Sequence, residues 1–305
     1  MSLNLKITPE VRDSIAENRP IVALESTIIT HGMPWPQNLE MAQKVETTVR
    51  EAGAVPATIA VLDGALHVGL ETDRLEALAQ AKNVAKLSRA DMAACMARGG
   101  TGATTVAATM IGARLAGIAV FATGGIGGVH QGAESSFDVS ADLHELAQTA
   151  VTVVAAGAKA ILDLPKTLEV LETLGVPVIT YGQDRLPAFW SRDAGLASPL
   201  RMDSAAEIAA AHAMRAALGL PGGQLVANPI PAEAEIARDT MLPVITRATE
   251  DADRHGITGK ALTPYLLQRI YELTEGRSLT ANIALVLNNA RLAAEIAREL
   301  SVRPA

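Results

Sequence analysis

Residues 118–130 read Ile-Ala-Val-Phe-Ala-Thr-Gly-Gly-Ile-Gly-Gly-Val-His and give the clearest indication of the fold. The run 118–122 is short and entirely apolar, which is typical of a parallel strand that is buried on both faces. The glycine-rich run 123–130 follows at the strand's carboxyl end, where open α/β sheets bind their ligands. Glycine lets backbone amides approach a ligand closely, so this loop either binds a phosphate or small polar substrate or is simply a tight turn.

The same pattern recurs along the chain, where short apolar runs alternate with helical stretches and so predict an α/β fold with a largely parallel sheet covered on both faces. Asp63-Gly64 suits a two-residue hairpin turn, so the sheet is expected to be mixed. The last 75 residues are expected to be all-helical. The predicted strands are 21–24, 58–62, 65–68, 84–87, 118–122, 151–155, 178–180 and 224–227. The predicted helices are 39–52, 89–97, 104–116, 140–149, 164–174, 204–217, 232–253, 263–274 and 279–300.

Composition excludes several classes of protein. The chain has 305 residues, 49% of them hydrophobic, and a net charge of −7, so it can build a large core and is poorly suited to nucleic acid. It has no apolar run long enough for a membrane helix and no signal-peptide pattern at its start. One cysteine, Cys95, excludes a disulfide framework and fits the cytoplasm. Because no linker interrupts the chain, one domain over residues 1–305 is expected.

Lys159 is the most unusual of the seven lysines, because it ends the buried-strand pattern Val-Thr-Val-Val-Ala-Ala-Gly-Ala-Lys of residues 151–159. Apolar surroundings disfavour the charged ammonium, and a neutral amine could attack a carbonyl carbon to form a Schiff base. The alternative is a lysine that extends from the strand end to water. The residues alone do not decide between the two.

Glu25 follows the first predicted strand, at a position where α/β folds place functional groups. Its neighbours in Ser-Thr-Ile-Ile-Thr-His-Gly, residues 26–32, carry hydroxyls and no acidic or basic group other than His31. The residue is a candidate general acid, and a buried structural acceptor is the more ordinary alternative.

A second glycine-rich segment, Arg-Gly-Gly-Thr-Gly-Ala-Thr-Thr over residues 98–105, precedes an apolar helix whose N-terminus would favour an anion. Neither glycine segment matches a dinucleotide fingerprint or a Walker loop. His130, at the end of the first segment, is a further candidate site residue.

Asp138, Ser140 and Asp142 place oxygen-bearing side chains at alternating positions after the first glycine loop. The glycine and glutamate of a calcium loop do not follow, so magnesium or manganese with several water ligands is the better interpretation. Ser140 could instead cap the helix that begins there. Farther along, Asn282 and Asn289 share one face of the last helix, and each could either reach into a site or cap a neighbouring loop.

Taken together, six segments resemble the pseudouridine-5′-phosphate glycosidase family. They are ALESTIITHGMPWPQNLEMA (23–42), ATIAVLDGALHVGL (57–70), RGGTGATTVAATM (98–110), FATGGIGGVHQGAESSFDVSADL (121–143), VVAAGAKAILDLPKTLEVLETLGVPVITY (153–181) and NIALVLNNARLAAEIA (282–297). They occur in order over most of the chain. The resemblance implies an α/β/α sandwich, a homotrimer and a cytoplasmic enzyme of pseudouridine catabolism; no kinase domain is attached.

The implied reaction is the reversible cleavage of pseudouridine 5′-phosphate to uracil and ribose 5-phosphate. This is pseudouridylate synthase activity, classed as a carbon–oxygen hydro-lyase although the reaction is of the glycosidase type. By resemblance Glu25 is the proton donor, Lys159 the nucleophile, and Asp138 the ligand of a divalent metal, usually Mn²⁺. The implied supporting residues are His130 and Asn282, and the implied substrate contacts are Lys86, Val106, Ser140, Ala141 and Asp142.

Two alternatives share some of these features. A class I sugar-phosphate aldolase would also use a Schiff-base lysine, but it normally has a barrel of eight strand–helix repeats, and no such period is present. A regulator that binds sugar phosphates without catalysis would use the glycine loops and keep Lys159 protonated. Borohydride trapping on Lys159 would exclude the regulator, and uracil release would exclude the aldolase.

Overall fold

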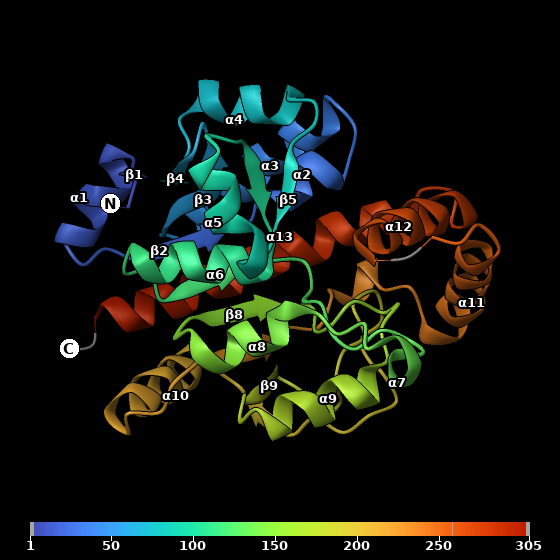
Figure 1. Ribbon diagram of the computed structural model, residues 1–305. Coiled ribbons are helices and arrows are strands. Elements are labelled where there is room, and N and C mark those ends of the chain that lie inside the picture. The colour runs from blue at the N-terminus through green and yellow to red at the C-terminus, as the bar shows by residue number, and fades with distance from the viewer. Residues whose placement is uncertain (1–2, 258, 303–305) are drawn as a thin grey trace.

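The computed structural model describes residues 3–257 and 259–302, and its centre is one mixed sheet of eleven strands (Figure 1). The sheet order is β1-β4-β3-β2-β7-β8-β11-β9-β10, and β6 joins the short β5 to β3. All pairs are parallel except β3 with β4 and β3 with β6, so the prediction of a mixed, largely parallel sheet is confirmed. The strands are β1 (Leu5–Ile7), β2 (Ile21–Leu24), β3 (Val55–Leu62), β4 (Ala65–Val68), β5 (Ala85–Leu87), β6 (Gly102–Thr104), β7 (Val120–Ala122), β8 (Thr152–Ala155), β9 (Val178–Tyr181), β10 (Leu200–Met202) and β11 (Gln224–Ala227).

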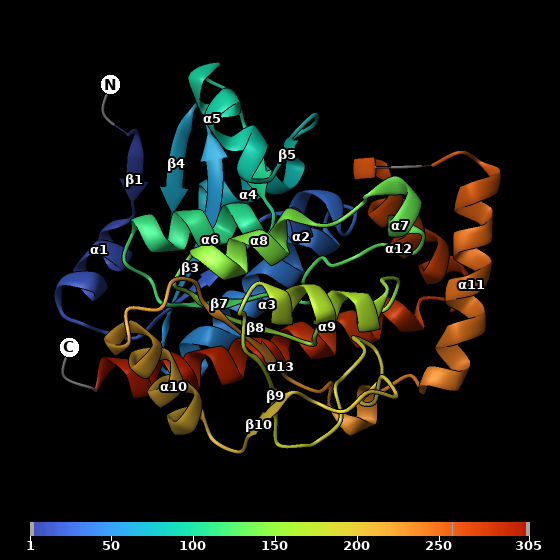
Figure 2. The same ribbon diagram turned by 60° about the horizontal axis from the view of Figure 1, so that its bottom comes forward.

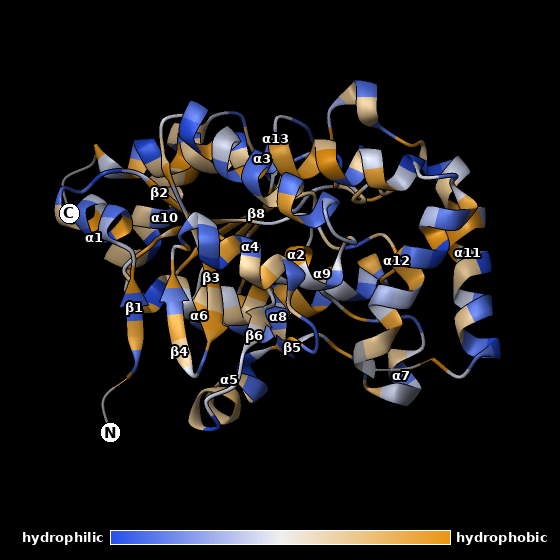
Figure 3. Cartoon of the chain, turned by 90° about the horizontal axis from the view of Figure 1, so that it is seen from above, coloured by the Kyte–Doolittle hydropathy of each residue, from blue (hydrophilic) through white to orange (hydrophobic). Residues whose placement is uncertain are grey.

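Helices cover both faces of the central strands, as the unbroken burial of β2, β7, β8 and β11 requires. Figure 3 shows α3 and α13 on one side of β2 and β8, and α6, α8 and α9 on the other. The helices are α1 (Pro9–Ala16), α2 (Thr27–His31), α3 (Gln37–Glu51), α4 (Thr72–Gln80), α5 (Arg89–Ala97), α6 (Val106–Leu115), α7 (Ala133–Ser136), α8 (Ala141–Gln148), α9 (Leu164–Thr173), α10 (Ala205–Ala217), α11 (Arg238–Arg254), α12 (Leu262–Leu273) and α13 (Arg277–Ser301). Among the described residues, none of these helices is both long and apolar enough to cross a membrane.

The C-terminal helices are arranged around the longest of them. α13 crosses the whole molecule, and α11 and α12 lie together at one end of it (Figures 1 and 2). Twelve of the 25 residues of α13 are buried, because this helix packs along β2, β7 and β8 as well as against α3 and α10. All regular elements among the described residues after β11 are helices, as predicted, although extended residues interrupt them at 235–237.

The hairpin turn between β3 and β4 has the predicted form. Asp63 and Gly64 both have positive φ, 50° and 74°, as a two-residue turn between antiparallel strands requires. A Cβ on Gly64 would lie 2.7 Å from the carbonyl oxygen of Met96, so the close approach of the chain also demands glycine here.

One predicted helix is wrong, and several short elements of the structure were not predicted. The predicted helix 232–253 is broken into a 3₁₀ turn (Ala232–Ala234) and α11, because extended residues between them place Ile236 in the core. There its backbone N–H donates to the carbonyl of Trp190, and its carbonyl accepts from the Ser191 hydroxyl. The three-residue strands β1, β6 and β10 and the helices α1, α2, α4 and α7 were not predicted, since their patterns are too short or too polar to stand out.

Candidate active site

A cavity of 490 Å³ opens at the carboxyl ends of β2, β7 and β8. The two glycine loops, α2, the start of α3, and residues of α12 and α13 form its walls. It brings together eight of the ten predicted site residues, and Asp138 and Ala141 are outside its lining. The eight are Glu25, Lys86, Val106, His130, Ser140, Asp142, Lys159 and Asn282.

Glu25 enters the cavity directly after β2, and two hydroxyl groups hold its carboxyl group. Thr27, at the start of α2, donates to Oε2, and Thr123, at the start of the first glycine loop, donates to Oε1. Both contacts come from neutral groups, so they orient the carboxyl group without adding a charge beside it. The side chain is only partly buried and lines the cavity, so it is accessible to a ligand.

Lys159 follows β8 and lies beside the first glycine loop. Its backbone N–H donates to the carbonyl of Ile126, and its Nζ donates to the carbonyl of Gly125 at 2.9 Å. The side chain therefore folds back across the strand ends into the cavity. The amine is thus within the cavity, where a nucleophile would have to lie, and the role of Lys159 stays a prediction.

Asp142 fastens the first glycine loop to the start of α6. Its Oδ2 accepts from the backbone N–H of Gly127 at 2.8 Å, and its Oδ1 accepts from that of Ala107 at 2.9 Å. The side chain is 6% exposed and sits in the first turn of α8, whose N-cap Ser140 accepts from the Asp142 N–H. A Cβ on Gly127 would lie 2.2 Å from the Ser140 hydroxyl, so only glycine fits there. The capping interpretation of Ser140 is confirmed.

The start of α6 forms another part of the wall. Thr105, the residue before this helix, and Val106, its first residue, both line the cavity. The buried Thr105 hydroxyl has no hydrogen-bond partner among the described residues. Backbone N–H groups at a helix N-terminus suit an anion.

Two histidines and two lysines share the cavity. Burial lowers the pKa of His130, and Lys159 and Lys86 lower it further against an opposing effect of Asp138. Burial and the charge of Lys86 also lower the pKa of His31, which lies at the end of α2 with Nδ1 2.6 Å from the Thr30 hydroxyl. His31 had no predicted role, although its place shortly after Glu25 could have indicated one. Both imidazoles are therefore held toward their neutral forms.

Asp138 lies in the loop before α8, beside His130 but outside the cavity lining. The carbonyl of Asp138 accepts from the His130 N–H at 3.0 Å, and its side chain is half-buried. Within residues 3–257 and 259–302, no three histidine, cysteine or acidic side chains are grouped to hold a metal. A single carboxylate fits an ion such as Mg²⁺ or Mn²⁺ only if water supplies most of its ligands. The metal remains a prediction.

The two asparagines of α13 have different roles: one lines the cavity and the other caps a neighbouring loop. Asn282 lines the cavity, and its Oδ1 accepts from the indole N–H of Trp190 at 2.7 Å. Asn289 is fully buried and caps the glycine loop, because its Nδ2 donates to the carbonyl of Thr123 at 2.8 Å. Its Oδ1 accepts from Asn228 at 3.1 Å.

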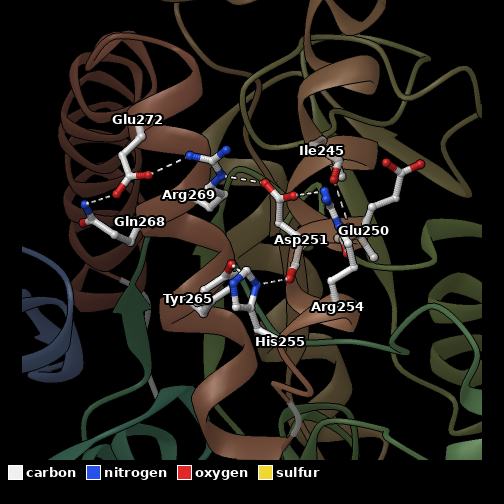
Figure 4. Close-up of polar contacts among 10 residues, drawn as sticks. Ile245, Glu250, Asp251, Arg254, His255, Tyr265, Gln268, Arg269 and Glu272 are labelled. Atoms are coloured by element: carbon white, nitrogen blue, oxygen red, sulfur yellow. Dashed lines mark hydrogen bonds and ion pairs between the residues drawn. The ribbon is translucent and has the colours of Figure 1, made fainter.

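α12 supplies a wall that the sequence did not indicate, formed by Thr263, Pro264, Leu267, Gln268 and Tyr271. Figure 4 shows how α11 holds this helix. Asp251 of α11 pairs with Arg269 of α12 at 2.7 Å and with Arg254, and Arg269 also pairs with Glu272 at 2.9 Å. Glu272 in turn accepts from Gln268 at 3.1 Å.

Comparisons with known proteins agree over nearly the whole chain. Residues 10–299 match the family model described as Indigoidine synthase A like protein. The pseudouridine-5′-phosphate glycosidase of Roseobacter denitrificans is 73% identical over 98% of this chain and 96% of its own length. That of Paracoccus denitrificans is 70% identical over 97% and 98%.

Solved structures give the same result. The prealnumycin C-glycosynthase AlnA, in complex with ribulose 5-phosphate, superposes with a TM-score of 0.91 at 40% identity over 99% of this chain and 98% of its own. An indigoidine synthase A-like protein of Thermotoga maritima gives 0.89 at 33% identity over 98% and 97%. The fold class predicted from the sequence is thus confirmed, and so is the resemblance. The chain is an enzyme and belongs to the pseudouridine-5′-phosphate glycosidase family.

Proposed function

We propose that the protein cleaves the carbon–carbon glycosidic bond of pseudouridine 5′-phosphate, giving uracil and ribose 5-phosphate through a Schiff base on Lys159. The observation that carries this proposal is the placement of Lys159 and Glu25 in one cavity, at the carboxyl ends of β8 and β2, the two strands that flank β7. The relatives named pseudouridine-5′-phosphate glycosidase and the sugar phosphate bound by AlnA support the same substrate class.

The bond to be broken explains why a lysine is needed. Uracil would leave as a poor carbanion in a simple displacement, so a pair of carboxylates of the usual glycosidase type is badly suited. A covalent route divides the reaction into easier steps. Glu25 protonates the ribose ring oxygen while the Lys159 amine attacks C1′, and the C1′–O bond breaks as the C1′–N bond forms.

The second half of the reaction releases the products. The opened sugar stays attached to Nζ through C1′, which still carries the base. The nitrogen bound to C1′ loses a proton and uracil gains one at C5. The C1′–C5 bond then breaks as the electron pair on nitrogen forms the iminium. Water adds at C1′ and releases ribose 5-phosphate with regeneration of the free amine. The carbonyl of Gly125, which accepts from Nζ, orients the amine before attack.

The phosphate is proposed to bind near Lys86, Ser140 and the start of α6. Lys86 supplies positive charge, and the Thr105 hydroxyl and those N-terminal amides of α6 that Asp142 does not bind supply donors. Ala141 lies outside the cavity lining, so its proposed contact would come from the backbone between Ser140 and Asp142. His130 and Asn282 are proposed as supporting polar groups.

A divalent cation, with Mn²⁺ as the first candidate, is proposed to bind at Asp138 with water as most of its other ligands. A bound cation would supply positive charge beside His130, a residue of the cavity lining. The chain is further proposed to act in the cytoplasm as a homotrimer, as the family resemblance implies.

The decisive experiment follows uracil release from pseudouridine 5′-phosphate by ultraviolet absorbance, with and without Mn²⁺. Borohydride should trap the sugar on Lys159 in the parent and not in a Lys159→Ala variant. Absence of uracil release would refute the proposed reaction. Trapping of a sugar phosphate without uracil release would favour an aldolase, although the sheet is not the closed barrel that such enzymes usually have.

A further inference from the structure

The contact between Trp190 and Asn282 fixes the orientation of an amide in the cavity wall. The indole Nε1 lies 2.7 Å from Asn282 Oδ1 and 3.2 Å from the carbonyl oxygen of Ser278. An indole N–H can only donate, so the amide must turn its oxygen toward it. Trp190 is 1% exposed, so its N–H depends on these two acceptors rather than on solvent.

The opposite end of the amide is left for a ligand. Asn282 lines the cavity, and no described residue accepts a hydrogen bond from its Nδ2. With Oδ1 held by Trp190, the atom that Asn282 can offer to a ligand is a donor. The matching atom of a ligand is then an acceptor, such as the carbonyl oxygen of a base, and an amino group is disfavoured.

Phe189 places a flat ring in the wall of the same cavity. Its ring meets that of Trp190 edge to face with centroids 4.9 Å apart, and it also lines the cavity. A Cβ on Gly125 would lie 2.7 Å from the Phe189 ring, and Gly125 is the residue whose carbonyl accepts from Lys159. Phe189 has a left-handed backbone, with φ of 61°. As a result, the Phe189 ring packs on Gly125 in the first glycine loop, and the next ring, that of Trp190, contacts Asn282.

We propose that Trp190 is a positioning residue that holds the Asn282 amide with Nδ2 toward the base, so that the enzyme selects a base carbonyl over an amino group. This inference rests on the proposed function and extends it to the choice of base. Trp190 does not touch the substrate and acts only through Asn282.

The test compares kcat/KM for pseudouridine 5′-phosphate with that for pseudocytidine and pseudoisocytidine 5′-phosphates, in which one or the other base carbonyl is replaced by an amino group. The parent should prefer the dicarbonyl base over at least one analogue by about 10-fold or more. Trp190→Phe keeps a ring but removes the N–H, so the amide can rotate and the preference should fall to about threefold or less. Asn282→Asp, which offers only oxygen to the ligand, should favour the amino analogue.

Trp35→Phe is the matched control, because Trp35 is the other tryptophan of the chain and is 47% exposed. It should keep the parent's preference. A folded Trp190→Phe variant with the parent's preference would overturn the proposal. If Trp190→Phe does not fold, the Asn282→Asp variant decides, and an unchanged preference for the dicarbonyl base in that variant overturns the proposal. The proposal is also overturned if the parent enzyme shows no preference between the bases. A parent that releases no uracil would show that the proposed function itself is wrong, and the inference would fall with it.

Discussion

Asp142→Asn tests whether the buried carboxylate of α8 holds the glycine loop in its working position. The substitution keeps the shape of the side chain, but its amide nitrogen must face either the Gly127 N–H or the Ala107 N–H, both of which are donors. One charge-assisted hydrogen bond is lost and one buried donor is left without a partner. Together these changes should destabilise the fold by about 2–3 kcal/mol.

For a chain of 305 residues that loss corresponds to a Tm lower by roughly 3–5 °C, which calorimetry measures. Because Gly127 lines the cavity, a shifted loop should also lower kcat/KM for uracil release by about 10-fold. The matched control is Glu145→Gln, which changes a fully buried acid on the same helix that pairs with Arg89 away from the cavity. It should lose stability and keep its kinetic constants. The reasoning would be refuted if Asp142→Asn were as stable and as active as the parent. It would also be refuted if Glu145→Gln lost as much kcat/KM as Asp142→Asn does.

Four further outcomes are expected. Lys159→Ala should fold normally and lose about 10³-fold or more of its uracil release, and near-normal turnover would exclude the Schiff base. Asp138→Ala should contain less manganese than the parent by metal analysis, and equal contents would make Asp138 structural. Free pseudouridine should have a far lower kcat/KM than its 5′-phosphate, and Lys86→Ala should reduce the ratio between the two values. Equal kcat/KM values for the two substrates in the parent would exclude a phosphate pocket at Lys86. Histidines with a lowered folded pKa bind protons more readily when unfolded, so stability should be complete above the unfolded value of about 6.5 and fall as the pH drops below it. A melting curve series from pH 8 to 5 checks this, and a flat profile would contradict the lowered pKa of His31, His67, His130 and His212.

The sequence was most informative where function depends on strand ends. Glu25 and Lys159 each follow an unbroken apolar run, and parallel strands bring their carboxyl ends to one edge, so their meeting could be anticipated. The hairpin at Asp63-Gly64 was equally readable, because two consecutive positive φ angles need residues of this kind.

Contacts between distant segments could not be read in the same way. Asn282 and Asn289 lie on one face of α13 with similar neighbours, yet one lines the cavity and the other caps a loop 166 residues away. The two asparagines have different contacts because of the way α13 lies across β7 and β8. A local sequence pattern cannot predict this placement. The wall from α12 and the contact of Trp190 with α13 likewise depend on packing between elements that are far apart in the chain.

The cavity does not share the acidic balance of the whole chain, because its lining holds two lysines and two acids. The whole protein carries a net charge of −7, but Lys86, Lys159, His31 and His130 gather around one opening. Of the two acids that line it, Asp142 is already bound to two backbone amides, which leaves Glu25 as the carboxyl group available to a ligand. Burial is the main cause that lowers the pKa of both histidines; the charge of Lys86 lowers each pKa further, and the charge of Lys159 also lowers that of His130. In the proposed function, the two lysines would attract the phosphate of the substrate, and its binding would hold the sugar next to Lys159 and Glu25.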